Sequence, residues 1–444
     1  MGRYYSDELE KGVMLLYFQR DPAKYAEGVS LIEQAVEKEE PDAFYFLARC
    51  YAWGDGNVES NDDKAIELSR RGIELGSDLC VLGADRFDGL HGALEAAMHH
   101  SLADSFEAVK QQAAAGDPMA QYAIGLFYFW QDISKLQQPR SKAEYDKNEI
   151  ENSKEAHKWF RMAARCGCIP AFRNVYYSFA DGVNGTPKDI RAALSFAEEA
   201  KDWVDLTGEF CRSVSMEYKE MNNPRQRIAW LERAADRGEG RCMNTLGVLY
   251  AEGKEGLPVD EQKAFSYYLR AAEAGNVDGM YNVAMKYNDG VGTARDSAKA
   301  FHYYQMGAEK GDKDCLYHTA RYYFNGEGGV RQDYAECLRL SKLAVEAGSY
   351  RAKYHIGYCY LYGKGCEINY ALALQNLTEC IAKADIPDSY RCLAEIYDRG
   401  LGVSANVQAA AENYQKAAEK GSIAAKEELE RGFKKNLFGK WKRK

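Results

Sequence analysis

The chain has 444 residues, of which 46% are hydrophobic and 28% charged, and its formal net charge is −9 at pH 7. This is the composition of a foldable, soluble protein, and 9 prolines in this length argue against a disordered or polyproline-rich chain. The acidic balance argues against an overall nucleic-acid binder, which usually carries a basic footprint. The chain contains no run of about 18 apolar residues, so we expect no transmembrane segment.

The first 235 residues predict a set of irregular helical pairs. The stretch DAFYFLARCYAWGDG, with Tyr51 and Gly54, predicts a first helix, and KAIELSRRGIELG, which ends at Gly76, predicts a second. The unit that follows, up to Gly116, keeps little of this pattern. We therefore predict that residues 1–235 form degenerate copies of one helical repeat.

One of these units carries a long insertion. Residues 131–153 separate its two predicted helices and read QDISKLQQPRSKAEYDKNEIENS. The stretch is polar and charged and has no apolar periodicity, which is typical of a surface loop. We therefore expect an inserted, extended loop at about 131–153.

Residues 236–421 repeat one pattern five times. A tyrosine recurs every 36 or 37 residues and is followed three positions later by a glycine; the tyrosines are Tyr250, Tyr287, Tyr323, Tyr360 and Tyr397. Small residues stand eight and three positions before each tyrosine, and a mostly aliphatic residue stands four before it. These spacings lie on one helix face, and the glycine marks where a left-handed residue would end the helix. A fixed period of this length indicates a solenoid of stacked helical pairs.

Residues 422–444 predict the end of the array. They begin like another first helix but lack the tyrosine and glycine, as expected of a capping helix that seals the last apolar face. The chain then ends in a basic stretch around Leu437, Phe438 and Trp441, with Lys434, Lys435, Lys440, Lys442, Arg443 and Lys444. We expect this stretch to be a frayed, solvated tail.

The repeated pattern, small-x-x-x-Leu-Gly-x-x-Tyr-x-x-Gly followed by Lys-Ala-x-x-Tyr-Tyr-x-x-Ala-Ala-x-x-Gly, resembles the Sel-1-like repeat, a relative of the tetratricopeptide repeat. The resemblance covers essentially the whole chain, strongly over residues 236–421 and more loosely before them. It implies an all-α, right-handed α-solenoid of about eleven antiparallel helix pairs, with the first helices on the concave side. It also implies an adaptor or scaffold that holds other proteins.

Binding residues are expected at positions that vary between units. Positions 6, 5 and 2 before each repeated tyrosine lie opposite the predicted core face and carry tyrosine, histidine, asparagine and arginine. Tyrosine and arginine anchor interfaces, and amides hydrogen-bond an extended backbone. We therefore predict an exposed ladder that binds a protein or peptide, and packing between units is the alternative. The predicted residues are Asn244, Tyr281, Asn282, Tyr317, His318, Arg321, Tyr354, His355, Tyr358 and Arg391.

Motifs for chemistry are missing from the sequence. It has no His-Glu-x-x-His, no Cys-x-x-Cys and no phosphate-binding Gly-x-x-x-x-Gly-Lys-Ser/Thr. The 12 cysteines do not recur as a pair in each unit, and some of them, such as Cys242 and Cys315, replace a small core residue. This pattern favours reduced thiols in a cytoplasmic protein. We expect no enzyme, catalytic residue, cofactor, metal site or small-molecule substrate.

Two other functions stay open. The chain could be a regulatory subunit that contacts a larger complex through residues 131–153. It could also bind a membrane or nucleic acid peripherally through its basic C-terminal tail. The sequence gives neither the identity of a protein partner nor the oligomeric state.

Overall fold

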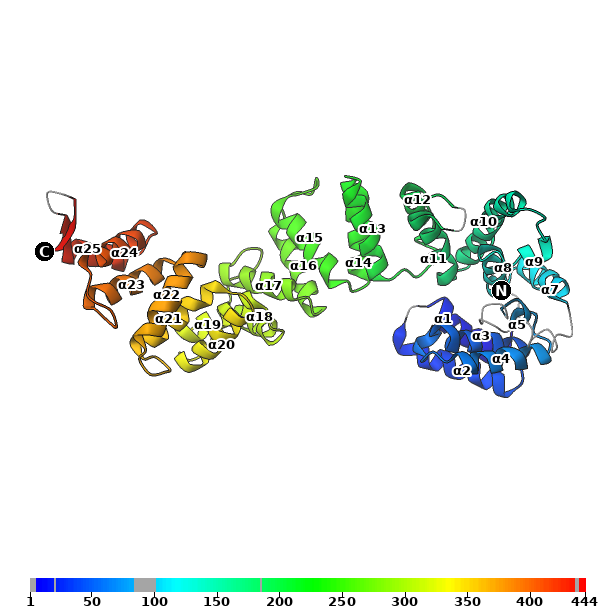
Figure 1. Cartoon of the computed structure of the whole chain (residues 1–444), viewed down its shortest axis with the longest axis horizontal. Helices are drawn as coiled ribbons and strands as arrows, with labels where there is room; N and C mark the ends of the chain where they lie inside the picture. The colour runs from blue at the N-terminus through cyan, green and yellow to red at the C-terminus, as the bar shows by residue number, and fades with distance from the viewer. Residues whose placement is uncertain (1–4, 20, 84–100, 184–185, 436–438) are drawn as a thin grey trace. The chain divides into compact units, whose positions relative to one another are not determined.

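The computed structural model describes residues 5–19, 21–83, 101–183, 186–435 and 439–444. Within these ranges the regular elements are helices, apart from one short two-stranded hairpin near the C-terminus (Figure 1). The predicted all-α repeat architecture is confirmed. The chain divides into two compact units, Met1–Phe210 and Cys211–Lys444, and the division falls inside helix α13, earlier than the change of pattern at residue 236.

The first unit is built from helices that pack against their neighbours in sequence, α1 on α2, α3 on α4, α8 on α10 and α11 on α12. Its elements are α1 (Asp7–Tyr17), η1 (Pro22–Lys24), α2 (Tyr25–Glu37), α3 (Pro41–Trp53), η2 (Asp55–Asn57), α4 (Asp62–Glu74), α5 (Asp78–Gly83), α7 (Leu102–Ala114), α8 (Pro118–Phe129), α9 (Ser134–Gln137), α10 (Lys142–Arg165), α11 (Ile169–Tyr177), η5 (Ser178–Gly182) and α12 (Ile190–Ala200). Residues 84–100, in the degenerate unit that ends at Gly116, lie outside the described residues.

The second unit continues the same arrangement more regularly. Its elements are α13 (Gly208–Glu220), α14 (Pro224–Asp236), α15 (Gly240–Glu252), α16 (Glu261–Glu273), α17 (Val277–Asp289), α18 (Ser297–Glu309), α19 (Lys313–Asn325), α20 (Tyr334–Glu346), η6 (Tyr350–Ala352), α21 (Lys353–Tyr362), α22 (Tyr370–Ala384), α23 (Pro387–Arg399), α24 (Val407–Glu419), α25 (Ile423–Gly432), β1 (Phe433–Lys435) and β2 (Trp441–Arg443). From α15 onward each second helix packs on its own first helix and on the first helix of the next pair, and α14 packs on α15.

Each regular pair is joined by the same turn. Helix α15 ends at Gly253, which has a left-handed φ of 62°, as the sequence predicted for this glycine. Helix α16 then begins at Asp260, whose carboxylate accepts a hydrogen bond from the Lys263 N–H at 2.9 Å. The Asp260 N–H donates to the carbonyl of Tyr250 at 2.9 Å. Equivalent N-caps begin the later second helices at Asp296, Asp333, Asn369 and Asn406. The repeated tyrosine therefore also supplies the carbonyl that fixes the turn.

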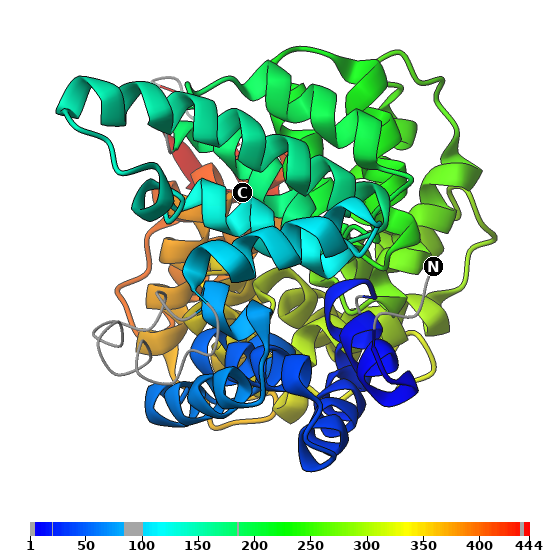
Figure 2. The same ribbon diagram turned by 90° about the vertical axis from the view of Figure 1, so that its right-hand side faces the viewer.

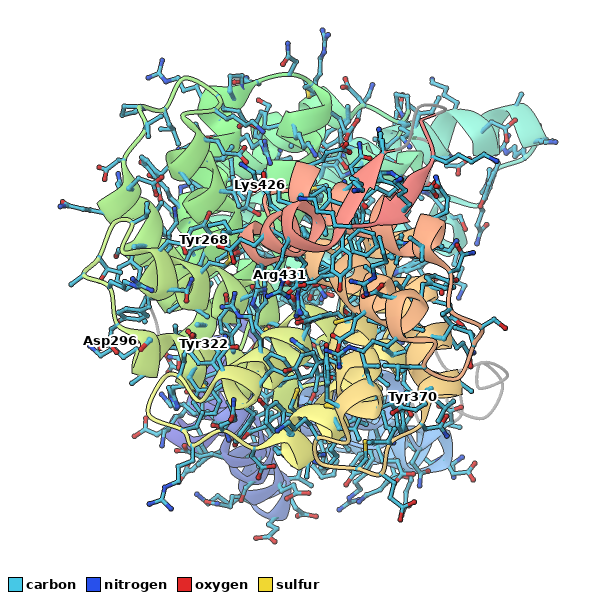
Figure 3. The ribbon with its side chains drawn as sticks, turned by 90° about the vertical axis from the view of Figure 1, so that its left-hand side faces the viewer. Tyr268, Asp296, Tyr322, Tyr370, Lys426 and Arg431 are labelled. Atoms are coloured by element: carbon cyan, nitrogen blue, oxygen red, sulfur yellow. The ribbon has the colours of Figure 1, made fainter. Side chains whose placement is uncertain are left out.

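Small residues bring the two helices of a pair close together. Gly247 on α15 faces the buried ring of Tyr268 on α16, and a Cβ at Gly247 would lie 2.6 Å from that ring. Gly357 faces Leu377 in the same way, at 2.6 Å. Figure 3 labels Tyr268 and Tyr322, two of the buried tyrosines that fill this core. The small residue three positions before the repeated tyrosine therefore allows the close approach of the two helices in these pairs.

The insertion does not form the extended loop expected from the sequence. Only its first part is a loop with the short helix α9, and α10 already begins at Lys142, so that this 24-residue helix projects beyond its neighbours (Figure 2). Ser141 caps α10 by accepting a hydrogen bond from the Glu144 N–H at 3.2 Å. The first turns of α10 are exposed. A helix that packs on nothing needs no apolar periodicity, and this is why the pattern resembled a loop.

The C-terminal stretch is not the frayed tail that the sequence suggested. It folds back as the hairpin β1–β2, with Phe433 opposite Arg443. Phe433 is buried, and its ring lies 5.7 Å from that of Tyr414 on α24. The Trp441 N–H donates to Gln408 Oε1 at 2.8 Å, and Arg443 forms an ion pair with Asp398. The aromatic residues of the stretch therefore help to cover the last helix pair; Leu437 and Phe438 lie outside the described residues.

Candidate protein-binding surface

The ten predicted binding residues lie on the first helices of the second unit, α15, α17, α19, α21 and α23. Seven of them are half-buried: Asn244, Tyr281, Asn282, Arg321, Tyr354, Tyr358 and Arg391. The other three, Tyr317, His318 and His355, are buried. We call these ten residues the ladder.

The ladder begins with a pair of amides. The Asn282 side-chain amide on α17 donates to Asn244 Oδ1 on α15 at 2.8 Å. The remaining amide atoms of both side chains have no hydrogen-bond partner within the described part of the chain. Because both side chains are half-buried, these atoms can pair with the backbone of a bound segment.

The middle of the ladder is a stack of aromatic rings, which corrects the expectation that all ten residues are exposed. Tyr304 of α18 stacks on His318 with ring centroids 4.6 Å apart, and Tyr317 stacks on His355 at 5.3 Å. Tyr317, His318 and His355 join neighbouring repeats instead of facing solvent, because Tyr317 reaches His355 of the next repeat and His318 reaches Tyr304 of the repeat before it. These three residues therefore serve the packing between repeats, which was the alternative to partner binding.

Burial also fixes the charge of the two histidines. Burial and the positive charges of Arg321 and Arg351 lower the pKa of His318 to about 3. Burial and Arg321 lower the pKa of His355 to about 3. Both rings are therefore neutral at pH 7, and neither is poised for acid–base chemistry near that pH.

The last part of the ladder is a row of tyrosines next to charged side chains. The rings of Tyr354 and Tyr358 are 6.1 Å apart, and that of Tyr362 lies 4.6 Å from Tyr358. The Tyr362 hydroxyl donates to Glu395 at 2.5 Å. Arg391 pairs with Asp388 at 3.6 Å. The sequence prediction missed Tyr362, which lies two positions after the repeated tyrosine and hence outside the positions considered.

The first unit has residues at the same positions, and the sequence prediction did not include them. Counting back from Tyr51 and Tyr128 gives Arg49 on α3 and Tyr122 on α8, and counting back from Phe179 gives Asn174 on α11. All three side chains line the same two surface hollows. The signal was present in the sequence, but the register of α11 is hard to read because its tyrosine position holds Phe179.

The cysteines behave as small core residues. All 12 are free thiols, and ten of them, including Cys242 and Cys315, are buried. Burial raises the pKa of the Cys242 thiol to about 12. A thiol that is protonated and buried is a poor nucleophile and a poor metal ligand.

Neither a metal cluster nor a membrane helix is found among the described residues. No group of three or more histidine, cysteine, aspartate or glutamate side chains in the described ranges is arranged to hold a metal ion. None of the helices described is both long enough and apolar enough to span a bilayer.

Comparison with known proteins identifies relatives of limited similarity. A regulator of chitin synthase from Saccharomyces cerevisiae, SKT5, is 29% identical over 233 residues, which are 50% of this chain and 33% of that protein. The matched part of the chain thus spans about a third of the length of this relative.

Solved structures are also similar to this chain, among them the following two. A Sel1 repeat protein from Oxalobacter formigenes has 23% identity and a TM-score of 0.47, over 73% of this chain and 89% of that one. The protective antigen c5321 from uropathogenic Escherichia coli has 19% identity and a TM-score of 0.48, over 90% of this chain and 89% of that one.

The family comparison covers most of the chain. The model of the Sel1 repeat matches residues 41–77, 147–168, 177–202, 223–239, 240–276, 277–312, 313–349, 351–379 and 387–422. These matches include more than half of the residues, and those between residues 240 and 422 coincide with successive helix pairs of the second unit. The chain therefore belongs to the Sel1 repeat family.

Proposed function

We propose that this chain is a non-enzymatic scaffold, acting in the cytoplasm, that binds a protein or peptide along the half-buried residues of the ladder. The observation that carries the proposal is the line of Asn244, Asn282, Tyr281, Tyr354 and Arg391 across consecutive repeats. Tyrosine and arginine are the residues that most often carry binding energy in interfaces. Amides that keep unpaired atoms can hydrogen-bond an extended chain.

The relatives support the same role. A protein described as a chitin synthase regulator acts through another protein, and half of this chain is similar to part of it. In a repeat array each unit packs only on its neighbours, which leaves an extended surface along the first helices for a partner.

The experiment is affinity capture from the native host followed by mass spectrometry. The test variant is Tyr281→Ala with Tyr354→Ala, since both rings are half-buried and their loss leaves the buried stack in place. The matched control is Tyr267→Ala with Tyr303→Ala, two half-buried tyrosines on the second helices α16 and α18. We expect one or more proteins to be lost from the test variant and kept by the control. Equal recovery from both variants would refute the ladder as the binding surface.

A second candidate surface is the projecting part of α10. Tyr145 and Ile150 on this part are 39% and 49% exposed, so this polar projection offers two large hydrophobic side chains to a partner. A subunit of a larger complex would use such a projection as a contact. If Tyr145→Ser with Ile150→Ser loses the captured proteins while the ladder variant keeps them, this second function replaces the first.

A further inference from the structure

Two adjoining hollows lie on the first helices of the first unit. One has a volume of about 180 Å³ and the other about 500 Å³, and both are lined by Arg49, Tyr122 and Asn174. These residues come from α3, α8 and α11 and occupy the same positions in the repeat as the ladder of the second unit. The smaller hollow is mainly apolar and the larger mainly polar, so that the pair offers two different environments side by side.

The smaller hollow fits one large apolar side chain. Its walls are formed mainly by aromatic and aliphatic side chains: Tyr45, Trp53, Leu82, Leu126, Phe127 and Trp130. An apolar cavity of about 150 Å³ in a protein is large enough to bind benzene. Trp53 and Trp130 are 46% and 55% exposed, so two indole rings border the hollow and stay accessible from solvent. Such exposed indoles are typical anchors of interfaces.

The larger hollow carries an excess of positive charge. The charged residues in its wall are Arg49, Arg173 and Asp55. The buried guanidinium of Arg49 is paired with Asp55 at 3.3 Å and lies 4.7 Å from the ring of Trp53. Arg173 is exposed, and no described carboxylate lies within ion-pair distance of it; its guanidinium is 5.9 Å from the ring of Tyr177. One positive charge is therefore left for a ligand.

An amide lies at the junction of the two hollows. The side chain of Asn174 lines both and has no hydrogen-bond partner among the described residues. An amide of this kind can pair with the backbone of a peptide that crosses from one hollow to the other.

We propose that the first unit has a peptide-binding site of its own, which takes a short acidic segment with one aromatic or large aliphatic side chain. The apolar side chain enters the hollow bordered by Trp53 and Trp130, and a carboxylate of the segment pairs with Arg173. The inference shares with the proposed function the view of the chain as a protein-binding scaffold, but the site lies in the other unit and can be tested separately.

The test measures fluorescence anisotropy of short labelled peptides with the full chain. The probe peptides carry one phenylalanine and two glutamates at varied spacing in an otherwise glycine and serine sequence. Matched peptides replace the glutamates by lysines or the phenylalanine by alanine. The protein variants are Arg173→Glu and Trp130→Ala. The controls are Arg191→Glu and Trp203→Ala, because Arg191 is exposed, Trp203 is half-buried, and neither lines the hollows of the same unit.

We expect at least one probe peptide to bind and both matched peptides to bind at least tenfold more weakly. Arg173→Glu and Trp130→Ala should each reduce affinity about tenfold or more, while both controls leave it within about twofold. Equal binding of the glutamate and lysine peptides, equal effects of Arg173→Glu and Arg191→Glu, or no binding by any probe would overturn the proposal.

The proposed function fails differently. Tyr281→Ala with Tyr354→Ala in the second unit should leave peptide binding unchanged, because the ladder and the hollows share no residue. A chain that binds the probes but captures the same proteins with and without the ladder tyrosines would retain the site of the first unit and lose the ladder. A chain that binds no probe peptide but loses captured proteins with the ladder variant would support the ladder and refute the site of the first unit.

Discussion

The phenol ring of Tyr317 on α19 stacks on the imidazole of His355 on α21, with centroids 5.3 Å apart and planes 15° from parallel. This contact joins two successive repeats through the side chains that were expected to face a partner. One unit earlier, His318 stacks on Tyr304 of the second helix α18, with centroids 4.6 Å apart, and lies 5.8 Å from the ring of Tyr281. Both histidines are buried, so the contact between repeats depends on their staying neutral.

The first prediction concerns pH. The pKa of His318 and that of His355 are about 3 in the folded chain, against about 6.5 when unfolded. Between pH 6.5 and 3 the unfolded state therefore binds more protons than the folded state. The contribution of the two neutral rings to the free energy of unfolding is complete above pH 6.5 and is lost as the pH falls toward 3. The slope is at most about 1.4 kcal/mol per pH unit for each histidine.

The measurement is hydrogen exchange of α19 and α21 between pH 6.5 and 5, where few carboxylates titrate, after correction for the intrinsic exchange rate. We expect the free energy of opening to fall with pH in the wild type and much less in His318→Phe with His355→Phe. His302→Gln, on the exposed side of α18, serves as the control. If the phenylalanine variant keeps the wild-type slope, the buried histidines are not its cause.

The second prediction concerns the close approach of α15 and α16. Gly247→Ala places a Cβ 2.6 Å from the ring of Tyr268, which is buried and cannot move aside. Overpacking of this kind costs about 1–3 kcal/mol. Urea unfolding followed by circular dichroism should show this decrease in the free energy of unfolding. Gly432→Ala is the control, since its Cβ would meet only the flexible end of Arg443, at 3.1 Å. Equal unfolding midpoints for both variants would contradict this packing.

The third prediction concerns the turns. The Asp296 side chain caps α18 by accepting a hydrogen bond from the Lys299 N–H at 3.0 Å, and Figure 3 shows Asp296 at the edge of the ribbon. Asp296→Ala should cost about 1 kcal/mol. Asp296→Asn should cost much less, because Asn369 and Asn406 cap the equivalent helices. Thermal unfolding of the two variants distinguishes these outcomes, and an asparagine variant as unstable as the alanine variant would rule out the capping explanation.

The fourth prediction concerns the C-terminal hairpin. Phe433 is buried against Tyr414, with the Arg443 guanidinium 4.8 Å from its ring, so Phe433→Ala should destabilise the last helix pair by about 3 kcal/mol. Faster hydrogen exchange in α24 and α25 would report it. Figure 3 labels Lys426 and Arg431, which mark the position of helix α25 in the structure. Lys434→Ala is the control, because this side chain is exposed on the same strand. Unchanged exchange in Phe433→Ala would mean that the hairpin does not support the array.

The repeat itself could be predicted from the sequence, because its cause is local. A tyrosine, a small residue three positions earlier and a glycine three positions later fix one helix face and one helix end, whatever the rest of the chain does. Their period then requires stacked helical pairs, since one pair cannot bury its own apolar face. The turn at Asp260, although unused in the prediction, is equally local.

Only the tertiary structure decided which variable residues are accessible. Tyr317 and Tyr354 occupy the same position in successive repeats, yet Tyr317 is buried under the next repeat and Tyr354 is half-buried. Helix periodicity places a side chain on a face, but the side chain of the neighbouring repeat determines whether solvent reaches it. The hollows at Arg49 and the folded hairpin at Phe433 likewise depend on residues distant in sequence, and such contacts leave no periodic pattern.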